Sequence, residues 1–552
     1  MEEVLEQRNK KVILLGNEAI VRGALESGVQ FAATYPGTPA SEIGDTFFRI
    51  FNSQFSISKK KIRDNFHFEY GTNEKVALES AIGANFSGLK TMVSMKHFGL
   101  NVAADSFMPL FYIGVSNGMV IVIGDDPGCF SSAQSEQNSR AYAYLAHAPM
   151  IEPSSPQECK DFTKYAFKMS KKYKIPITIR ITTRVAHQRM PVKLEKLKFS
   201  QLKADFPKDK PNQFTTMPPY TIFQHKELLN KIKFIQKNEV EKSEFNKLFN
   251  ENKKSDLAII TSGITFLHAM EAQEFLNLKI PTFKLGWFYP LPEEKIKKLL
   301  SKFKKVLVIE ELEPYLEKEI KILSPNKNVQ IFGKKYFSTA GEIRPEHIVE
   351  TLKKFYPKAN IRANFPTKKI DVPKRLPGFC KGCPYWFLFN AVKQSAPKNT
   401  VFGGDIGCYM MAYFPPFELQ DYLSCMGSGI GIGHGIKKSL NISKNKQKVI
   451  AFIGDSTFFH AGIPALINCI ENKSNPLIII MDNRTTAMTG QQPRPGLKNR
   501  PNIEEIVAGC GVKHLKIIDP INQAELKQTI KEFLKKKEVS VIISRRPCKF
   551  AK

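Results

Sequence analysis

The feature that most constrains the fold of this chain is a pair of apolar strands, each followed by an oxygen-bearing side chain. Residues 449–453 form an apolar run that ends in Gly454 and Asp455, and residues 477–481 form a second run that leads to Asn483. About one helix of sequence separates the two runs, which is typical of a β-α-β unit. Because parallel strands present their carboxyl ends to ligands, we expect the two turns to share a binding edge.

These turns carry the kinds of ligand that Mg²⁺ prefers. Asp455 offers a carboxylate oxygen, Asn483 an amide oxygen and Thr485 a backbone carbonyl. Mg²⁺ takes oxygen ligands in an octahedron and usually shares them with a diphosphate. A single Gly-Asp turn would equally fit a surface loop after a core strand, so the paired spacing is what favours a metal site. No Gly-x-x-x-x-Gly-Lys-Ser/Thr is present here, which excludes a P-loop.

The residues around both turns resemble a known cofactor signature. Gly454, Asp455 and Ser456, followed by Asn483, resemble the thiamine diphosphate motif, with Ser456 where most such enzymes have glycine. The continuation over 482–493 reads Asp-Asn-Arg-Thr-Thr-Ala-Met-Thr-Gly-Gln-Gln-Pro. It is similar to the large subunits of indolepyruvate ferredoxin oxidoreductases, within the 2-oxoacid:ferredoxin oxidoreductases. The resemblance implies that thiamine diphosphate and Mg²⁺ are held at these turns.

Length and pattern predict an α/β protein of several domains. A chain of 552 residues is too long for one core, and its strands alternate with amphipathic stretches. The resemblance implies two thiamine diphosphate-binding domains, one pyrimidine-binding (PYR-like) and one diphosphate-binding (PP-like), flanking a transketolase C-terminal-like domain. We place the pyrimidine-type domain at 1–188, a linker with a charged helix at 189–254, the transketolase-type domain at 255–370, and the diphosphate and Mg²⁺ domain at 371–552.

The net charge of +30 first suggests nucleic acid or an anionic membrane as a partner. The excess is mostly lysine spread along the chain, without an arginine-aromatic binding module, so we expect neither partner. An acidic electron carrier such as ferredoxin would suit the same surface. The amino-terminal residues lack the apolar core of a signal peptide, and no apolar run reaches about 18 residues. We therefore predict a cytoplasmic protein whose nine cysteines are thiols or metal ligands.

Several candidate catalytic residues lie in the first domain. The turn over 35–42, with two prolines and a glycine, is either a strand-to-helix connection or a loop that presents Thr38 to a substrate. The resemblance favours the second interpretation. Glu74 begins a helix rich in small residues, where an acid suits the helix dipole. The resemblance implies instead that Glu74 contacts the aminopyrimidine of the cofactor and activates it, with Glu79 as the competing and structural position.

Three basic residues follow strands of the same domain. Lys96 and His97 end the strand at 91–96, where they could polarise a substrate carbonyl or bind its carboxylate. A lone histidine is more often structural, and the resemblance is what favours function. Arg140 ends a loop similar to one in the family and could clamp a carboxylate in bidentate fashion. A surface arginine is the alternative.

The middle of the chain shows no chemistry of its own. Residues 189–255 are rich in lysine and proline, with a charged helix expected over 225–252. The acidic run of Glu310, Glu311 and Glu313 could be mistaken for paired catalytic carboxylates. We interpret it as the end of a strand and the start of a helix in a scaffold domain.

Four cysteines of the last domain could bind iron. Cys380 and Cys383 form a C-x-x-C motif, and Cys408 and Cys548 come from distant stretches. The resemblance implies that they hold a four-iron (4Fe-4S) cluster near the thiamine, since such a cluster needs four thiolates. Buried thiols and a zinc site are the alternatives.

A glycine-rich stretch and a histidine complete the candidate site. Gly427 and Gly429 belong to a run, 426–435, that resembles a dinucleotide loop, which alone is a weak signal. Because it precedes the Gly454 turn, we interpret it as close packing that lets the backbone approach the diphosphate. His460 follows the same turn and could face the reaction centre.

The resemblance spans nearly the whole chain and implies a reaction. We expect oxidative decarboxylation of a 2-oxoacid, an arylpyruvate such as indolepyruvate, to an acyl-coenzyme A with electron transfer to ferredoxin. It also implies a smaller β-type partner subunit and dimerisation. The chain departs from many such subunits in lacking a ferredoxin-like tail with two C-x-x-C-x-x-C-x-x-x-C-P runs. A non-oxidative thiamine decarboxylase and a basic nucleic-acid-binding scaffold are the alternative hypotheses.

Overall fold

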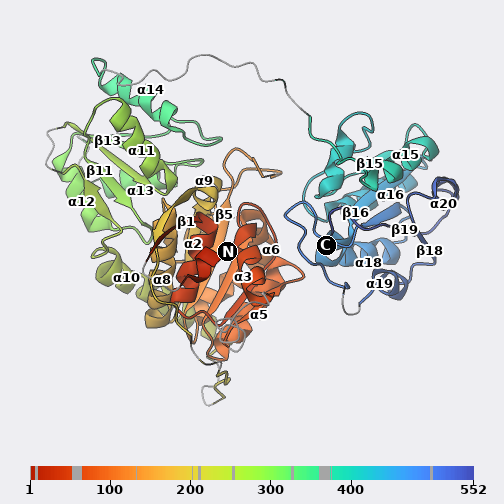
Figure 1. Cartoon of the computed structure of the whole chain (residues 1–552), viewed down its shortest axis with the longest axis horizontal. Helices are drawn as coiled ribbons and strands as arrows, with labels where there is room; N and C mark the ends of the chain where they lie inside the picture. Colours follow the sequence, from red (N-terminus) through yellow and green to blue (C-terminus); the bar gives the residue numbers. More distant parts are fainter. Residues whose placement is uncertain are drawn as a thin grey trace. The chain divides into compact units, whose positions relative to one another are not determined.

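The computed structural model describes two compact units, Met1–Lys369 and Ile370–Lys552. Figure 1 colours the first from red to green and the second from turquoise to blue. The described residues are all but 1, 7–9, 53–64, 132, 200, 202, 209–212, 252–254, 325–328, 360–372, 374, 375, 498–500 and 552. The predicted boundary between residues 370 and 371 lies outside the described residues, as does the one after 254.

The first unit is built on a seven-stranded sheet that is parallel except at one edge. Its order is β12 (Trp287–Tyr289), β6 (Met150–Ile151), β7 (Ile177–Thr182), β5 (Met119–Asp125), β4 (Thr91–Lys96), β2 (Phe31–Thr34) and β3 (His67–Tyr70). Only the β12–β6 pair is antiparallel. The central strands β4, β5 and β7 are buried along their whole length, which explains their nearly continuous apolar sequences.

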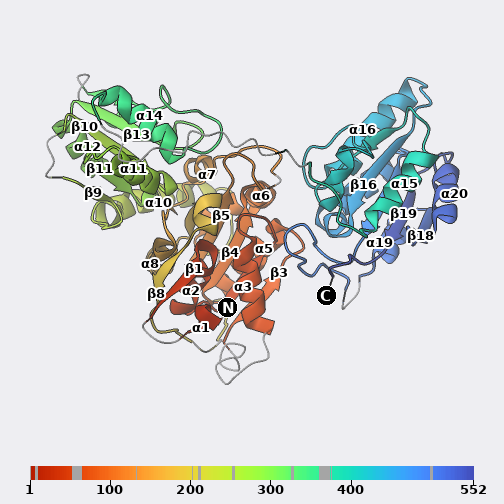
Figure 2. The same cartoon turned by 45° about the horizontal axis from the view of Figure 1, so that its top comes forward.

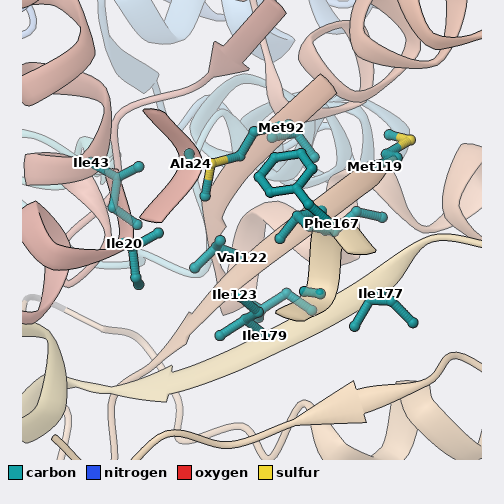
Figure 3. Close-up of a cluster of buried hydrophobic side chains, with 14 of the residues drawn as sticks. Ile20, Ala24, Ile43, Met92, Met119, Val122, Ile123, Phe167, Ile177 and Ile179 are labelled. Atoms are coloured by element: carbon teal, nitrogen blue, oxygen red, sulfur yellow. The ribbon is translucent and has the colours of Figure 1, made fainter. Parts of the chain in front are cut away.

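Helices enclose the core of this sheet. They are α1 (Glu2–Leu5), α2 (Gly16–Glu26), α3 (Ser41–Asn52), α5 (Glu74–Phe86), α6 (His97–Ile113), α7 (Arg140–Leu145), α8 (Pro156–Tyr173) and α9 (Thr183–His187). Figure 3 shows Phe167 of α8 with Met92, Val122 and Ile179 from neighbouring strands. Each buried side chain of this size contributes about 1.5–3 kcal/mol of transfer free energy, so this core fixes the strand ends that carry the candidate site.

The segment predicted as a linker with a charged helix forms strand pairings with the regions before and after it. Strand β8 (Arg189–Lys193) pairs antiparallel with β1 (Lys11–Leu15). The charged helix is α10 (Tyr220–Ile235), followed by the π-helical turn η1 (Gln236–Val240). The predicted continuation to residue 252 is wrong, because β9 (Lys247–Phe249) is an edge strand against β11 (Thr282–Leu285). The pairing with β11 gives this segment a backbone partner that the sequence alone does not show.

A third sheet follows within the first unit. Its order is β14 (Gln330–Phe332), β13 (Lys305–Ile309), β10 (Leu257–Ser262), β11 and β9, with helices α11 (Ile264–Phe275), α12 (Glu293–Lys302), α13 (Tyr315–Leu323) and α14 (Pro345–Phe355). Glu310 follows β13 and accepts hydrogen bonds from the Leu316 and Glu317 amides in the first turn of α13. That is the behaviour of an acid at a helix amino terminus, so the scaffold interpretation of Glu310 is confirmed.

The second unit is a five-stranded, all-parallel sheet. Its order is β15 (Val401–Gly403), β16 (Val449–Gly454), β17 (Leu477–Asp482), β19 (Ser540–Arg545) and β18 (His514–Ile518). Its helices are α15 (Tyr385–Ser395), α16 (Ser428–Ile442), α17 (Asp455–Thr457), α18 (Ile463–Glu471), α19 (Ile503–Gly509) and α20 (Gln523–Phe533), with the 3-10 helix η2 (Cys408–Tyr413) and the π-helical turn η3 (Phe458–Gly462). The predicted α/β class is confirmed.

The two faces of this second sheet carry separate cores. Phe452 and Ile479 point toward α15 and α20, which pack on each other (Figure 2). Ile453 and Ile480, one residue further along each strand, belong to the other core, beneath α18 and α19. This alternation is the period-2 pattern of a doubly covered strand. In the described part of the chain, none of the helices combines the length and apolar character that crossing a bilayer requires.

Candidate active site

The two predicted turns lie on adjacent strands. Strands β16 and β17 are parallel neighbours in a register that pairs Gly454 with Met481. Asp455 therefore begins α17 beside the point where β17 reaches Asn483, and Asp455, Asn483 and Thr485 are all buried. The β-α-β prediction for this region is confirmed.

Asp455 accepts hydrogen bonds at both carboxylate oxygens. Its Oδ1 accepts from the Ser456 amide at 2.8 Å, and its Oδ2 from the Arg484 amide at 2.9 Å. The Nε of Arg494 also donates to Oδ2, at 2.5 Å. A buried cation thus sits against the acid that we expect to hold the metal.

Arg494 bridges two acids. Its Nη2 donates to Asp482 Oδ1 at 2.5 Å, and Arg545 Nε donates to Asp482 Oδ2 at 2.7 Å. Burial and the neighbouring Asp482 raise the pKa of Asp455 against the opposing effect of Arg494. Burial would also raise the pKa of Asp482, but the two arginines outweigh it and lower that pKa. Arg494 is therefore the countercharge that lets both carboxyl groups lie side by side.

The oxygen types present fit Mg²⁺. One carboxylate, the Asn483 amide oxygen and the Thr485 carbonyl are hard ligands of the kind Mg²⁺ takes alongside a diphosphate. The Thr485 amide donates to Asn483 Oδ1 at 3.0 Å, which orients that oxygen. Over the described ranges, no group of three or more His, Cys, Asp or Glu side chains is placed to hold a metal ion. The magnesium assignment thus depends on a mixed ligand set and stays a prediction.

The glycine-rich stretch packs as closely as expected. Gly427 caps α16 with φ of 86°, in the left-handed region, and its amide donates to Asp405 Oδ1 at 2.7 Å. A Cβ on Gly429 would lie 2.8 Å from the Gly404 carbonyl oxygen. Close packing at these two glycines is confirmed. The amino terminus of α16 is a favourable place for a diphosphate because of the helix dipole, and this role stays a prediction.

Two further predicted residues follow the metal turn. Ser456 Oγ lies 2.9 Å from Thr486 Oγ1, so the serine that replaces the usual glycine joins the two turns. His460 is buried in the π-helical turn η3. Such turns are often found at functional sites, and the role of His460 stays a prediction.

The four predicted cysteines approach one another from separate stretches of the second unit. Burial, with Cys380 and Cys548 as charged neighbours, raises the pKa of the Cys383 thiol to about 11. Burial, with Cys383, Cys548 and Cys380 as neighbours, raises the pKa of the Cys408 thiol to about 11 as well. The thiols are near enough to influence one another's pKa, but in the described residues no three cysteines form a group placed to hold a metal ion. The cluster itself stays a prediction.

A hydrogen-bonded group at the carboxyl edge of the first sheet contains Thr38, Lys96 and Ser131. Lys96 Nζ donates to the carbonyl and hydroxyl oxygens of Ser131, both at 3.1 Å. Ser131 Oγ in turn lies 2.9 Å from the Thr38 carbonyl oxygen, to which it donates. Burial lowers the pKa of Lys96 to about 8. A 2-oxoacid carboxylate would find both a cation and hydroxyl groups here.

His97 begins α6 and is fully buried. Its Nδ1 lies 3.1 Å from the Gly124 carbonyl oxygen, which fixes the proton on Nδ1. Its Nε2 is a buried nitrogen without a hydrogen-bond partner. Burial lowers the pKa of His97, so the imidazole is neutral at pH 7 with Nε2 as an acceptor.

Glu74 and Glu79 differ in the way that the sequence analysis expected. Glu74 is buried at the start of α5, after the Asn73 side chain accepts the Val76 amide at 2.9 Å. It packs so closely on α6 that a Cβ on Gly99 would lie 2.5 Å from Glu74 Cγ. Glu79 is exposed, and its Oε1 accepts from Ser106 Oγ at 2.6 Å. Only Glu74 has the burial that a cofactor-activating carboxylate needs.

Arg140 occupies a buried ion-pair network. Its Nε and Nη2 donate to the two oxygens of Glu152, at 2.7 Å and 2.6 Å. Its Nη1 donates to Glu310 Oε2 at 3.1 Å. The alternative of a surface arginine is wrong, because only 3% of the side chain is exposed. The clamp role stays a prediction, although these carboxylates engage the guanidinium in this structure.

Arg494, Asp405 and Tyr409 belong to the site, and sequence reasoning missed all three. The signal for Arg494 is its place between two prolines in the loop that follows Asn483. Asp405 and Tyr409 stand in the stretch that was considered only for Cys408. Burial raises the pKa of Asp405 to about 6, against the opposing hydrogen bond from the Gly427 amide.

Comparison with known proteins identifies the family. Residues 22–256 match the model of the pyruvate flavodoxin/ferredoxin oxidoreductase thiamine diphosphate-binding domain, and residues 405–544 that of the C-terminal TPP-binding domain of thiamine pyrophosphate enzymes. Indolepyruvate oxidoreductase subunit IorA of Methanothermobacter thermautotrophicus is 40% identical over 99% of this chain and 88% of its own length. The chain belongs to the IorA family. It is therefore a subunit of a thiamine diphosphate-dependent oxidoreductase.

A second IorA relative agrees with this assignment. The IorA subunit of Pyrococcus horikoshii is 39% identical over 98% of this chain and 86% of its own length. Among solved structures, 2-oxoglutarate:ferredoxin oxidoreductase from Magnetococcus marinus aligns with a TM-score of 0.49 and 17% identity, over 63% of this chain and 65% of that chain. The expected resemblance to the large subunits of this family is confirmed over nearly the full chain.

Proposed function

We propose that this chain catalyses the oxidative decarboxylation of a 2-oxoacid, an arylpyruvate such as indolepyruvate, to an acyl-coenzyme A, with ferredoxin as electron acceptor. The observation that carries the proposal is the pair of turns at which Asp455 and Asn483 end adjacent parallel strands. The names of the IorA relatives support indolepyruvate as the substrate.

The second unit would bind the cofactor. Asp455, Asn483 and the Thr485 carbonyl would hold Mg²⁺, and Arg494 would keep one Asp455 oxygen oriented by its hydrogen bond to the other. The turn from Gly454 to Ser456 and the glycines of the α16 amino terminus would admit the diphosphate. When bound, thiamine diphosphate supplies the nucleophilic carbon and the electron sink for loss of CO₂.

The first unit would activate the cofactor and bind the substrate. The buried carboxylate of Glu74 would accept a hydrogen bond from the aminopyrimidine ring and hold the ring in its reactive tautomer. Lys96 and Thr38 would bind the substrate carboxylate, and the Nε2 of His97 would accept a hydrogen bond near the reacting carbonyl. Arg140 would position this edge of the sheet through Glu152, and His460 would line the reaction centre.

The remaining part of the proposal concerns the route of the electrons and the partners of this chain. Cys380, Cys383, Cys408 and Cys548 would hold a 4Fe-4S cluster that takes the electrons singly. The IorA relatives are named as subunits, which supports a smaller partner subunit. We also propose assembly into a dimer of heterodimers or a homodimer of this chain. We propose a cytoplasmic enzyme that binds coenzyme A and ferredoxin, without a nucleic-acid or membrane partner.

An anaerobic dye-reduction assay tests the proposal. The chain, alone and with its partner subunit, would receive thiamine diphosphate, Mg²⁺, coenzyme A and one of indolepyruvate, phenylpyruvate or pyruvate. We expect viologen reduction that prefers aryl substrates, depends on coenzyme A and disappears in Asp455→Ala. Release of CO₂ and aldehyde without dye reduction would instead identify a non-oxidative decarboxylase and contradict the cluster assignment.

A further inference from the structure

Two hydrogen bonds join the cysteines to the metal-binding turns within the second unit. We use "thiol group" for Cys380, Cys383, Cys408 and Cys548, and "cofactor turn" for residues 454–456 with 483–485. One connection runs through the Tyr409 hydroxyl, and the other through the Cys548 backbone. Both connections end on residues at the cofactor turn itself.

Tyr409 connects Cys408 to the first half of the cofactor turn. The Gly454 amide donates to Tyr409 Oη at 3.0 Å, and the hydroxyl proton is within reach of Asp405 Oδ2 at 2.9 Å. A Cβ on Gly454 would lie 2.6 Å from this hydroxyl, so a glycine is required at that position. Tyr409 follows Cys408 directly in the short helix η2. A shift of the turn is therefore transmitted to Cys408 across a single residue.

Cys548 connects to the second half. Its amide donates to the Asn483 carbonyl at 2.9 Å, and the Arg546 amide donates to the Asp482 carbonyl at 3.0 Å. The chain after β19 thus continues alongside the predicted metal ligand. Because this connection uses backbone atoms, it survives any substitution at Tyr409.

Asp405 holds the arrangement rigid. Its carboxylate is fully buried and accepts from the Gly427 amide as well as from Tyr409. The ring of Tyr409 packs edge-on to Tyr385, with centroids 5.9 Å apart. Tyr385 and Tyr409 belong to one buried cluster, against which Cys383 and Cys408 pack. One packed group of side chains therefore contacts the α16 amino terminus, the cofactor turn and the thiol group.

We propose that the thiol group and the cofactor turn are one coupled site, in which Tyr409 is the positioning residue that links Cys408 to the turn. This inference rests on the proposed function, since it takes Mg²⁺ with thiamine diphosphate as the ligand of the turn. By thermodynamic reciprocity, occupation of either part then changes the other. Cofactor binding restrains Cys408 through Tyr409 and Cys548 through Asn483.

Cysteine-resolved alkylation tests the coupling without an activity assay. The full-length, iron-free chain would react with iodoacetamide with and without Mg²⁺ and thiamine diphosphate, and mass spectrometry would give a rate for each cysteine. In the unsubstituted chain we expect the cofactor to slow alkylation of Cys408 and Cys548 by at least about fivefold relative to Cys510. In Tyr409→Phe we expect less than about twofold protection of Cys408, while that of Cys548 persists.

The controls separate the possible failures. Tyr413→Phe removes an exposed hydroxyl from the same helix and should retain both protections. Equal protection of Cys408 in Tyr409→Phe would mean that the cofactor merely covers the thiol, which overturns the coupling. Calorimetric titration of the same samples would show whether the cofactor binds. Binding without any change in thiol rates overturns the coupling alone, whereas absence of Mg²⁺-dependent binding overturns the proposed function as well.

Discussion

Two strands of this chain end in the same Gly-Asp pair, yet their aspartates have opposite surroundings. Asp125, after Gly124 on β5, accepts from the Ser139 amide at 2.9 Å and from Arg180 Nε at 2.6 Å. Asp455, after Gly454 on β16, lies beside a second acid, Asp482, with Arg494 between them. Each aspartate contacts a buried arginine, but only Asp455 lies beside a strand that ends in a second acid and an amide.

The neighbouring strand decides which of the two arrangements forms. Strand β7 pairs with β5 and places Arg180 in the fully buried row beside Asp125. Strand β17 pairs with β16 and leads to Asp482 and Asn483 instead. A Gly-Asp turn is therefore not diagnostic by itself. Its function is set by the residue that the adjacent strand brings to the same edge.

The largest expected effect is on the stability of the first unit. Asp125→Asn leaves the buried Arg180 with only its 3.2 Å contact to Glu152, and loss of one member of a buried pair costs about 3–5 kcal/mol. Urea unfolding followed by circular dichroism measures the change. Asp455→Asn is the matched substitution, and we expect its free energy of unfolding to stay within about 1 kcal/mol of the unsubstituted chain, because burial and the neighbouring Asp482 already disfavour the charged form of Asp455. Equal losses in both variants would contradict the comparison.

The second prediction concerns Glu74, a proposed catalytic residue of the first unit that lies at the start of a helix and not at the end of a strand. We expect Glu74→Gln to lower the rate of dye reduction by about 100- to 1,000-fold, since it removes the proposed proton-holding carboxylate. Glu79→Gln, on the same helix and exposed, is the control and should change the rate less than twofold. A similar loss in both variants would indicate damage to α5 rather than loss of a catalytic group.

The pH dependence of stability distinguishes the two units further. Burial would raise the pKa of Glu152, but Arg140 and Arg180 outweigh it and hold that pKa at about 2, below the ordinary 4.5. A lowered pKa stabilises the fold above the unfolded value, so this contribution is lost as pH falls from 4.5 toward 2. We expect a loss of about 2–3 kcal/mol over that window.

Thermal unfolding between pH 2 and 6 measures this dependence. Glu152→Gln lacks the titrating group, so its curve should lie below that of the unsubstituted chain at pH 6 and meet it near pH 2. The contribution of Asp405 to stability depends on pH in the opposite direction. Burial raises the pKa of Asp405 to about 6, so its stabilising contribution is lost as pH rises through that value. Parallel curves for Glu152→Gln and the unsubstituted chain would contradict the ion-pair account.

The smallest expected effect concerns the serine in the metal-binding turn. Ser456→Gly restores the residue usual in this signature but removes the contact with Thr486 Oγ1. A single hydroxyl contact contributes about 0.5–1.5 kcal/mol, so cofactor affinity should weaken by about two- to tenfold. Isothermal titration would measure it. Tighter binding in Ser456→Gly would mean that the contact opposes the bound geometry.

Local patterns predicted the strand ends, and long-range pairings could not be predicted in the same way. The turns at Asp455 and Asn483 were predictable because each follows a continuous apolar run, and the intervening length fits a β-α-β crossover. The network around Arg140 was not, because Glu310 reaches it from 170 residues further along the chain. The segment Lys247–Phe249 was predicted as helix, since it becomes a strand only when β11 lies beside it.

The candidate site shows the same division. Lys96 and His97 were predictable from their place after a strand, whereas the proximity of Cys408 to Cys548 depends on how β19 returns beside β17. Arg494 was missed because charge compensation between Asp455 and Asp482 exists only once both strands are paired. The role of such residues depends on the charges that surround them in the folded site, which no local sequence pattern shows.

The central claim is that the Asp455 turn, and not the similar Asp125 turn, holds Mg²⁺ and thiamine diphosphate. The most direct test is calorimetric titration of Mg²⁺ with thiamine diphosphate into the unsubstituted chain, Asp455→Asn and folded Asp125→Asn. The account predicts saturable, Mg²⁺-dependent binding that weakens by at least about 100-fold in Asp455→Asn, the scale of a lost charged ligand, and changes little in Asp125→Asn. Unchanged binding in Asp455→Asn, or loss only in Asp125→Asn, would contradict it.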